Sequence, residues 1–325
     1  MITGYPLATT SWDEQEIQAM QEVIKSGNFT MGKCVQDYEK KFASYLGSKY
    51  CVMVSSGSTA NLIMVASLFF RKGTKLKRGD EVIVPAVSWS TTYYPLQQYG
   101  LKLKFVDIDL DTLNFDLEKL KSAITPKTKL IMAVNLLGNP NDFQKINEMI
   151  QGKDIILIED NCESLGATFQ GKQAGTFGLM GTFSSFFSHH ISTMEGGIVC
   201  TDDEELYHIL ICLRAHGWTR NLPKENHVTG TKSDNAFEES FKFVLPGYNV
   251  RPLELSGAIG LKQLDKLASF IDIRRKNAET FTSEFSKIDH LRIQKEIGAS
   301  SWFGFSFVIS PNAPFTRHEL IDHLM

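Results

Sequence analysis

Residues able to do chemistry gather in a few short segments, and two adjacent histidines form the first of them. His189 and His190 lie in FFSHHISTMEGG (186–197), between an aromatic stretch and a glycine pair. Neighbouring side chains point to opposite faces of a strand and diverge on a helix, so this pair is a poor metal site. The remaining histidines show no HExxH or comparable spacing, and we expect no metal. A histidine of ordinary pKa can, however, transfer a proton near neutral pH.

A second group consists of carboxylates at the end of an apolar run. The segment ILIEDNCESLGA (156–167) delivers Glu159 and Asp160 at the carboxyl end of an expected buried strand. A carboxylate there is costly unless it pairs with a positive group. One suitable partner is a protonated pyridine nitrogen, because that ion pair keeps the ring an electron sink. An aspartate that caps an ordinary loop explains this segment alone equally well.

Two further segments suit a phosphate and a flat ring. SSGSTANL (55–62) runs through Gly57 into a helix start, where backbone amides bind anions and glycine permits a close approach. VPAVSWSTTYY (84–94) places Trp89 in a polar loop after a strand, where an aromatic ring can stack on a cofactor. Taken singly, both have a simpler explanation, since strand–glycine–helix turns and tryptophans packed under loops are common.

These segments lie at the ends of short apolar runs that alternate with helical patterns. Strands are predicted at 50–56, 81–85, 103–109, 129–135, 154–160, 181–186 and 197–202, and helices at 34–46, 58–70, 91–99, 116–124, 141–150 and 203–215. Such alternation is typical of a mostly parallel sheet covered by helices. After residue 250 the pattern changes to a long helix (252–286) and a strand (304–310).

We therefore predict an α/β fold with a large domain (1–250) and a smaller C-terminal α/β domain (251–325). The second domain is thin. Thr316 is a suitable N-cap for a further helix, but only nine residues follow it. We expect the natural chain to continue beyond this point.

Composition restricts the class of protein. The chain has 325 residues, of which 42% are hydrophobic and 22% charged, with a formal net charge of −3. This balance gives no basic surface for nucleic acid or an anionic membrane. The five cysteines form no CxxC pair and fit buried thiols better than a disulfide framework. Without a signal peptide or an 18-residue apolar run, we expect a cytoplasmic protein.

In their order along the chain, the motifs resemble those of the DegT/DnrJ/EryC1/StrS sugar aminotransferases, which have the aspartate-aminotransferase fold (PLP fold type I). The resemblance extends from SGNFTMGKCVQDYEKKFASYLG (26–47) to residue 264. It implies a pyridoxal 5′-phosphate (PLP) cofactor and a homodimer with active sites at the subunit interface.

The resemblance also implies roles for individual residues. The cofactor-binding positions and their roles are Gly57, Ser58 and Ser184 for the phosphate, Trp89 for stacking on the ring, Asp160 for the pyridine nitrogen, Glu163 for the 3-hydroxyl and Asn249 for the phosphate held by the partner subunit. His216 and Arg220, in LRAHGWTRNLP (213–223), match a segment in which the family binds substrate.

One position departs from the family pattern. Family aminotransferases hold the cofactor covalently through a lysine about seven residues before the glycine pair, and that position is His189 here. Ser188 replaces a common asparagine, and no lysine lies between Lys172 and Lys224. We therefore expect PLP, or its amine form pyridoxamine 5′-phosphate (PMP), to bind non-covalently.

A histidine at this position resembles a subgroup of the family, the PLP-dependent 3-dehydratases of nucleotide-linked 4-keto-6-deoxy sugars. The resemblance implies removal of the C3 hydroxyl of GDP-4-keto-6-deoxy-D-mannose, with L-glutamate as amino donor and release of ammonia. The product would lead to colitose in the O-antigen of lipopolysaccharide. His189 is then the catalytic base, and we expect His190 to be structural and to point away from the cofactor.

Three alternatives are weighed against this interpretation. An iron–sulfur relative acting on CDP-sugars needs clustered cysteines, whereas the closest pair here, Cys200 and Cys212, has eleven residues between. An ordinary aminotransferase is disfavoured by the missing lysine. A non-catalytic PLP-binding homologue lacks supporting motifs. Spacing alone does not identify the nucleotide.

Overall fold

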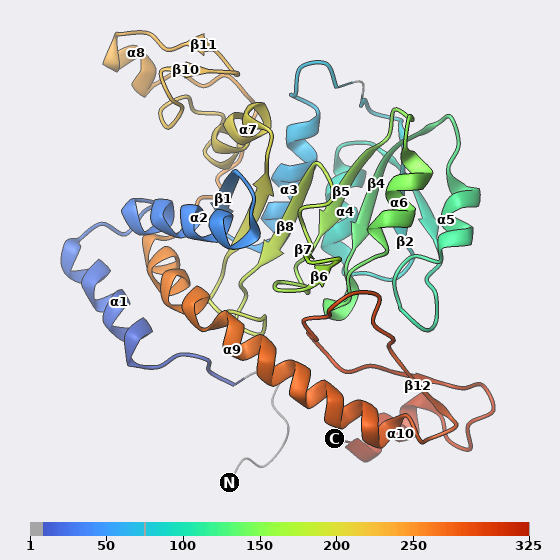
Figure 1. Ribbon diagram of the computed structural model, residues 1–325. Helices are drawn as coiled ribbons and strands as arrows, with labels where there is room; N and C mark the ends of the chain where they lie inside the picture. The colour runs from blue at the N-terminus through green and yellow to red at the C-terminus, as the bar shows by residue number, and fades with distance from the viewer. Residues whose placement is uncertain (1–8, 75, 325) are drawn as a thin grey trace.

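A seven-stranded sheet forms the centre of the computed structural model, which describes residues 9–74 and 76–324 (Figure 1). Its strand order is β1-β9-β8-β5-β4-β2-β3, and only β9 runs antiparallel to its neighbours, β1 and β8. The strands of this sheet are β1 (Tyr50–Val54), β2 (Glu81–Pro85), β3 (Lys102–Val106), β4 (Thr128–Val134), β5 (Ile156–Asp160), β8 (Met180–Ser184) and β9 (Gly197–Thr201).

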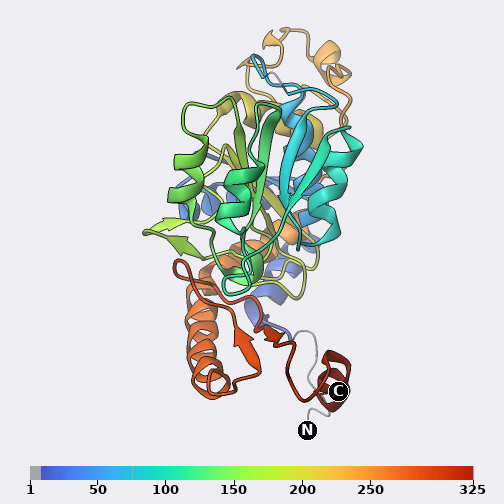
Figure 2. The same ribbon diagram turned by 90° about the vertical axis from the view of Figure 1, so that its right-hand side faces the viewer.

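Helices cover both faces of this sheet (Figure 2). Alternate strand residues point to opposite faces, so Val52, Val84 and Ile158 pack with α3 and α7, whereas Met53 and Leu157 face the other side. The helices are α1 (Glu14–Ser26), α2 (Lys33–Leu46), α3 (Gly57–Leu68), α4 (Ser90–Gln98), α5 (Leu117–Ala123), α6 (Phe143–Ile150), α7 (Glu204–Arg214), α8 (Ala236–Ser240), α9 (Glu254–Phe285) and α10 (Arg317–Leu324).

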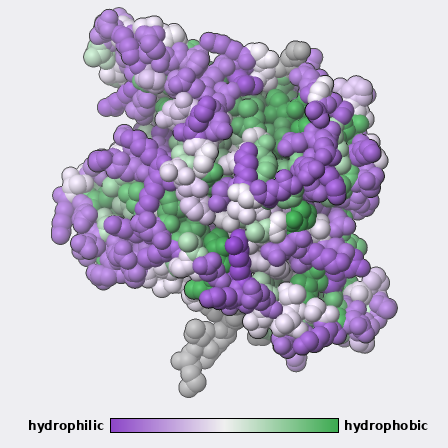
Figure 3. Space-filling view, in the orientation of Figure 1, coloured by the Kyte–Doolittle hydropathy of each residue, from purple (hydrophilic) through white to green (hydrophobic). Residues whose placement is uncertain are grey.

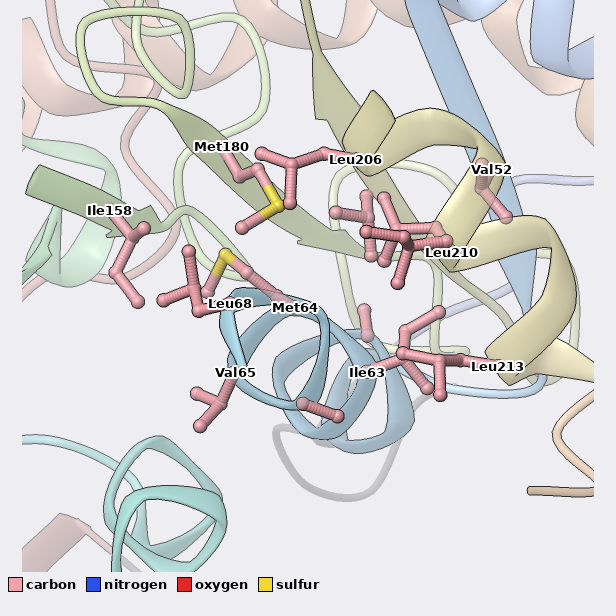
Figure 4. Packing of buried hydrophobic residues seen from close by; sticks show 14 of the residues in the cluster. Val52, Ile63, Met64, Val65, Leu68, Ile158, Met180, Leu206, Leu210 and Leu213 are labelled. Atoms are coloured by element: carbon pink, nitrogen blue, oxygen red, sulfur yellow. The ribbon is translucent and has the colours of Figure 1, made fainter. Parts of the chain in front are cut away.

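The helix α3 is apolar on nearly all sides because it is enclosed between the sheet and α7. Figure 4 shows its packing, with Ile63, Met64, Val65 and Leu68 of α3, Leu206, Leu210 and Leu213 of α7, and Val52, Ile158 and Met180 of the sheet. Every one of these side chains is buried. Burial of a side chain of this size contributes roughly 1.5–3 kcal/mol. This packing fixes the first turn of α3, with Gly57, at the carboxyl ends of the strands.

The α/β fold class predicted from the sequence is confirmed, and each predicted strand and helix of the sheet region has a counterpart within a few residues. The prediction omitted α1, α8 and two short hairpins, which pair β6 (Thr168–Phe169) with β7 (Lys172–Gln173) and β10 (Glu225–Asn226) with β11 (Gly230–Thr231). The strand predicted at 304–310 is confirmed as β13 (Phe307–Ile309), but its partner β12 (Leu291–Ile293) was not predicted. The hairpin strands have two or three residues each. Periodicity needs a longer window than this.

From α9 onward the chain lies beside the sheet region rather than in it (Figures 1 and 2). A domain boundary near residue 250 stays a prediction. None of the helices within residues 9–74 and 76–324 combines the length and apolarity that a membrane crossing requires. The face of the molecule seen in Figure 3 is mostly hydrophilic, with hydrophobic side chains in scattered groups.

Candidate active site

The candidate phosphate site forms where the first turn of α3 meets the ends of two strands. A Cβ atom added to Gly57 would lie 2.7 Å from the Ser184 Cβ atom and 2.9 Å from the Cys162 sulfur, so only glycine fits. Ser56 caps the helix by accepting a hydrogen bond from the Thr59 amide at 3.2 Å. Gly57 and Ser58 follow Ser56 as the first two residues of the helix, where backbone amides suit an anion.

Asp160, the last residue of β5, lies in a polar network beside this turn. Its Oδ2 atom accepts hydrogen bonds from Asn61 of α3 and Thr92 of α4, each at 2.8 Å. Its Oδ1 atom accepts one from the Cys162 amide at 3.1 Å. The side chain is buried, and among the described residues no lysine or arginine forms an ion pair with it. The carboxyl group is thus oriented by neutral donors, and no cationic partner for it lies among the described residues.

The neighbouring carboxylate of Glu159 points to the opposite side of the sheet and serves a structural purpose. Its two oxygens accept hydrogen bonds from the amides of Gly175, Phe177 and Gly178 at 2.6–2.7 Å. Burial raises the pKa of Glu159, and these amides oppose that rise. Of the two acidic residues at this strand end, only Asp160 faces the candidate site.

Glu163 reaches the same region from the loop after β5. Its Oε2 atom accepts a hydrogen bond from the Leu137 amide at 2.9 Å. Burial raises the pKa of Glu163, and the nearby Asp160 carboxylate raises it further. This carboxyl group can therefore hold a proton, and donate it in a hydrogen bond, at a higher pH than an exposed glutamate.

Trp89 precedes the first residue of α4 and lies one helical turn before Thr92, whose amide donates to the Trp89 carbonyl at 3.1 Å. Thr92 is also a partner of Asp160, so the start of α4 lies at the candidate site. The indole is 73% exposed. A tryptophan so exposed beside a buried carboxylate offers an open apolar face to a flat ligand.

His189 lies in the loop between β8 and β9, close enough to Asp160 for the carboxylate to raise its pKa. Burial has the larger effect and lowers the pKa to about 4, and Arg274 lowers it too. Its Nδ1 atom is buried without a hydrogen-bond partner among the described residues. At neutral pH the imidazole is therefore uncharged and able to accept a proton.

His190 is buried next to the segment 300–303. Its Nε2 atom lies 3.0 Å from the Ser301 carbonyl oxygen, and the side chain is fully enclosed. Burial, aided by Arg274, lowers the pKa of His190 to about 3. Phe303 contacts both rings, since its centroid lies 5.0 Å from that of His189 and 5.7 Å from that of His190. The two histidines differ in hydrogen bonding, because the Nε2 atom of His190 has the Ser301 carbonyl as its partner.

The loop that carries both histidines is fastened by residues distant in sequence. Trp12 donates from its indole nitrogen to the Ser192 carbonyl at 3.0 Å, and the Ser192 amide donates to the Gln263 side chain at 3.0 Å. Gln263 lies on α9 and also binds Glu16 of α1 at 2.8 Å. The N-terminal helix and α9 together hold this loop.

The sequence did not reveal a further wall of the site, made by residues 300–303. Phe303 packs edge-on against His189, with ring centroids 5.0 Å apart at 61°. The segment is hydrogen-bonded to the turn that follows β4, because the Phe303 amide donates to the Leu137 carbonyl at 3.0 Å. Leu137 and Trp302 have left-handed backbones, with φ of 55° and 48°. Such non-glycine residues with positive φ are a signal of function in a structure, but they leave no trace in sequence.

The remaining predicted site residues form a separate group. His216 and Asn249 belong to paired segments, since the His216 amide donates to the Tyr248 carbonyl at 2.7 Å and Ala215 bridges to Asn249. The guanidinium of Arg220 lies 5.1 Å from the Trp218 ring centre. In the described part of the chain, no hydrogen bond or ring contact joins this group to His189 or Asp160.

The residues present fit a pyridoxal phosphate. The backbone amides at the α3 start, which Gly57 brings close to Ser184, suit its phosphate, and the buried Asp160 lacks the positive partner that a protonated pyridine nitrogen supplies. Glu163 and Trp89 lie at the same strand ends. No group of three or more potential metal ligands occurs within residues 9–74 and 76–324.

The comparisons with known proteins agree with this geometry. The DegT/DnrJ/EryC1/StrS aminotransferase family matches residues 10–325. A curated relative from Yersinia pseudotuberculosis, GDP-4-keto-6-deoxy-D-mannose 3-dehydratase, is 68% identical over 100% of this chain and 83% of its own length. Many more distant family members, including GDP-perosamine synthase of Escherichia coli O157:H7 at 30% identity, match as well.

Solved structures are similarly close. GDP-4-keto-6-deoxymannose-3-dehydratase with a trapped PLP–glutamate geminal diamine superimposes with a TM-score of 0.98 at 66% identity, covering 99% of this chain and 83% of that one. A variant of GDP-4-keto-6-deoxymannose-3-dehydratase (ColD), in which an adjacent serine and histidine are replaced by asparagine and lysine, has a TM-score of 0.96 at 66% identity. The match covers 97% of this chain and 83% of that one.

Proposed function

This chain belongs to the DegT/DnrJ/EryC1/StrS aminotransferase family, and from that premise we propose that it is a PLP-dependent 3-dehydratase of a nucleotide-linked 4-keto-6-deoxy sugar. The substrate is GDP-4-keto-6-deoxy-D-mannose and the amino donor is L-glutamate, in keeping with the 68% identical dehydratase and the PLP–glutamate adduct of the similar structure. The product is a 3-deoxy-4-keto sugar on the route to colitose of an O-antigen.

The observation that carries this proposal is an uncharged histidine beside Asp160 where an aminotransferase has its lysine. Ser188–His189 is the only serine–histidine pair in the sequence. It corresponds to the pair that the ColD variant replaces with asparagine and lysine. A histidine cannot form the covalent link that a lysine amine forms, so the cofactor is held here by non-covalent contacts alone.

When bound, PLP in its amine form supplies an electron sink that makes a neighbouring C–H bond acidic. Asp160 keeps the proton on the pyridine nitrogen, and Glu163 binds the 3-hydroxyl. Gly57, Ser58 and Ser184 hold the phosphate while Trp89 covers the ring. These contacts orient the reacting atoms and exclude water from one face.

His189 moves the proton that dehydration requires. Its pKa of about 4 leaves the imidazole uncharged at pH 7, so it can accept a proton from carbon. The resulting imidazolium, next to Asp160, returns that proton to the C3 oxygen as the C3–O bond breaks. The C3 hydroxyl thereby leaves as water, and its second hydrogen is the proton that His189 took from the cofactor-side carbon. The two electrons that this removal requires come from glutamate, which is released as 2-oxoglutarate, and the nitrogen is released as ammonia.

The proposal includes a homodimer in which His216, Arg220 and Asn249 serve the active site of the partner subunit. In the described part of the chain these residues make no hydrogen bond or ring contact with His189 or Asp160, which leaves their side chains available to the site of a partner. Arg220 suits a diphosphate or a carboxylate because its guanidinium donates two parallel hydrogen bonds. A cytoplasmic location is part of the same proposal.

The test is product analysis with the purified protein, PLP, glutamate and GDP-4-keto-6-deoxy-D-mannose. We expect ammonia, 2-oxoglutarate and a 3-deoxy sugar. An amino sugar as the main product would overturn the proposal in favour of an aminotransferase. Loss of PLP on dialysis after borohydride treatment would confirm that the cofactor is not covalently held.

A further inference from the structure

We propose that Arg274 and Phe303 are positioning residues for His189: Arg274 of α9 fixes the segment 300–303, and Phe303 of that segment holds the imidazole in its working orientation. This inference rests on the proposed function, because it assigns to these residues the orientation of the proposed base. Neither residue was among the candidates identified from sequence.

The need for such residues follows from the surroundings of His189. A catalytic histidine is usually oriented by a hydrogen bond at the ring nitrogen that does not react. Here Nδ1 has no such partner among the described residues. A lysine in this position would be held by its bond to the cofactor, whereas histidine forms none. Packing is therefore the means of orientation that remains.

Two aromatic rings supply this packing. Phe303 lies 5.0 Å from the imidazole centre at an angle of 61°, and Phe186 lies 6.1 Å away at 81°. Both are edge-to-face contacts, the preferred geometry for aromatic pairs. Phe186 is local to the loop of His189, but Phe303 is brought from far along the chain, so its position depends on what fixes the segment 300–303.

Arg274 fixes that segment. Its guanidinium donates from one nitrogen to the carbonyl oxygens of Trp302 at 3.0 Å and Phe303 at 3.1 Å. These carbonyls flank the left-handed backbone of Trp302, a conformation that persists only where surrounding contacts hold it. The next residue, Arg275, donates to the Ser300 carbonyl at 3.1 Å.

The charge of Arg274 has a second effect. Within the described chain Arg274 has no carboxylate partner, and burial lowers its pKa. The charged or titratable groups that act on His189 are Asp160, which favours the protonated ring, and Arg274, which opposes it. His190, the titratable neighbour in sequence, is itself kept uncharged by burial. Burial is the main cause of the lowered pKa of His189, and the charge of Arg274 acts in the same direction.

The experiment compares Arg274→Gln with Arg275→Gln, which loosens the same segment but does not act on His189. A second pair, Phe303→Leu and Phe303→Tyr, separates loss of the ring from a conservative change. We expect Arg274→Gln and Phe303→Leu to lower kcat about 10- to 100-fold, with the KM for the sugar changed less than about twofold. Arg275→Gln and Phe303→Tyr should retain most of the wild-type kcat.

A second readout does not depend on activity. The ring signal of His189 in ¹³C-histidine-labelled full-length chain, assigned by its loss in His189→Asn, reports the protonated fraction at about pH 5.5. We expect this fraction to rise in Arg274→Gln and to stay at the wild-type level in Arg275→Gln. In Phe303→Leu the imidazole of His189 is less restrained, so its ring signal should broaden or shift. Phe303→Tyr should preserve the wild-type signal.

The inference fails if Arg274→Gln matches Arg275→Gln in kcat and in protonated fraction. If Arg274→Gln does not fold, equal kcat and equal ring signals in the two Phe303 variants overturn it instead. A wild-type protein that forms no 3-deoxy sugar would contradict the proposed function, while the ring signals still decide whether Arg274 and Phe303 control His189.

Discussion

Two pairs of neighbouring residues, Glu159–Asp160 and His189–His190, divide between the site and the core. Glu159 accepts hydrogen bonds from a loop, and His190 contacts the Ser301 carbonyl. Asp160, the second residue of its pair, and His189, the first residue of its pair, lie together at the site. The division arises because successive side chains of a strand or turn point in different directions. Asp160 and His189 thus face the site, while Glu159 and His190 stabilise the backbone on which they lie.

The charge of Asp160 is predicted to hold the cofactor. Asp160→Asn keeps the shape of the side chain but removes the charge that pairs with a pyridinium. A charge-assisted hydrogen bond contributes about 1.5–3 kcal/mol, so we expect PLP affinity to fall roughly 10- to 100-fold and activity to fall at least as much. Titration of PLP followed by absorbance measures the affinity. Unchanged affinity and activity in this variant would rule out the assigned role.

Buried, uncharged histidines are predicted to make stability depend on pH. The pKa of His190 falls from 6.5 to about 3 on folding. Between these values the unfolded chain binds more protons, so the free energy of unfolding decreases as the pH falls below about 6.5. His190→Gln, which can still donate to the Ser301 carbonyl, should reduce this decrease. Urea unfolding at several pH values measures it, and identical slopes in the two proteins would contradict the prediction.

At the level of elements, the residues at the strand ends could be predicted from the sequence, but the segments that pack around them could not. One apolar run ends in Asp160, and another leads to Gly57 at the start of α3. The hydrophobic periodicity of such runs can be read directly from a sequence. Phe303 and Arg274 contribute through contacts between segments far apart in the chain, which no local pattern encodes. The helix α1 was also missed, although Asp13 and Glu16 form a capping box at its start. The sequence thus predicted the sheet and the residues at its edge, but not the segment that packs on His189.

One such long-range contact stabilises α2. Its N-terminal Gly32 has no side chain for capping, and Glu254 of α9 accepts hydrogen bonds from the amides of Gly32 and Cys34, each at 2.6 Å. Glu254 is buried. In Glu254→Gln the amide group replaces one accepting oxygen with a donor, and we expect a loss of about 1–3 kcal/mol in the free energy of unfolding.

Urea unfolding measures this loss, with Asp116→Asn as the matched control. Asp116 caps the short helix α5 from its own N-terminus, and asparagine caps equally well. A smaller effect is therefore expected from the control. If Glu254→Gln were no less stable than Asp116→Asn, the proposed cap would have no energetic role.

At the level of the whole molecule, no hydrogen bond or ring contact joins the second group of site residues to His189 or Asp160 within the described part of one chain. His189 and Asp160 lie at the strand ends, whereas His216, Arg220 and Asn249 lie near the end of α7. A twofold dimer repeats both groups on each subunit and can place one beside the other. The proposed dimer gives the second group of residues a role at the site of the partner subunit.

Mixing two inactive variants tests this arrangement. A His189→Asn subunit and an Arg220→Ala subunit together form dimers in which one of the two shared sites is intact. Random mixing should restore up to about one quarter of wild-type activity. Refolding or co-expression of the pair, followed by an ammonia assay, measures the recovery. No recovery from a mixture shown to contain heterodimers would place both residues in the site of one subunit.

The central claim is that a histidine in place of the lysine makes this family member a dehydratase. The most direct test is the amount of ammonia released for each sugar consumed, measured for the wild type and for the Ser188→Asn, His189→Lys double variant with glutamate as donor. For the wild type we expect about one ammonia per sugar and no amino sugar, because His189 can only transfer protons. The double variant should release far less ammonia per sugar. A wild-type protein that converts the sugar into an amino sugar without releasing ammonia would show that this chain is an aminotransferase instead.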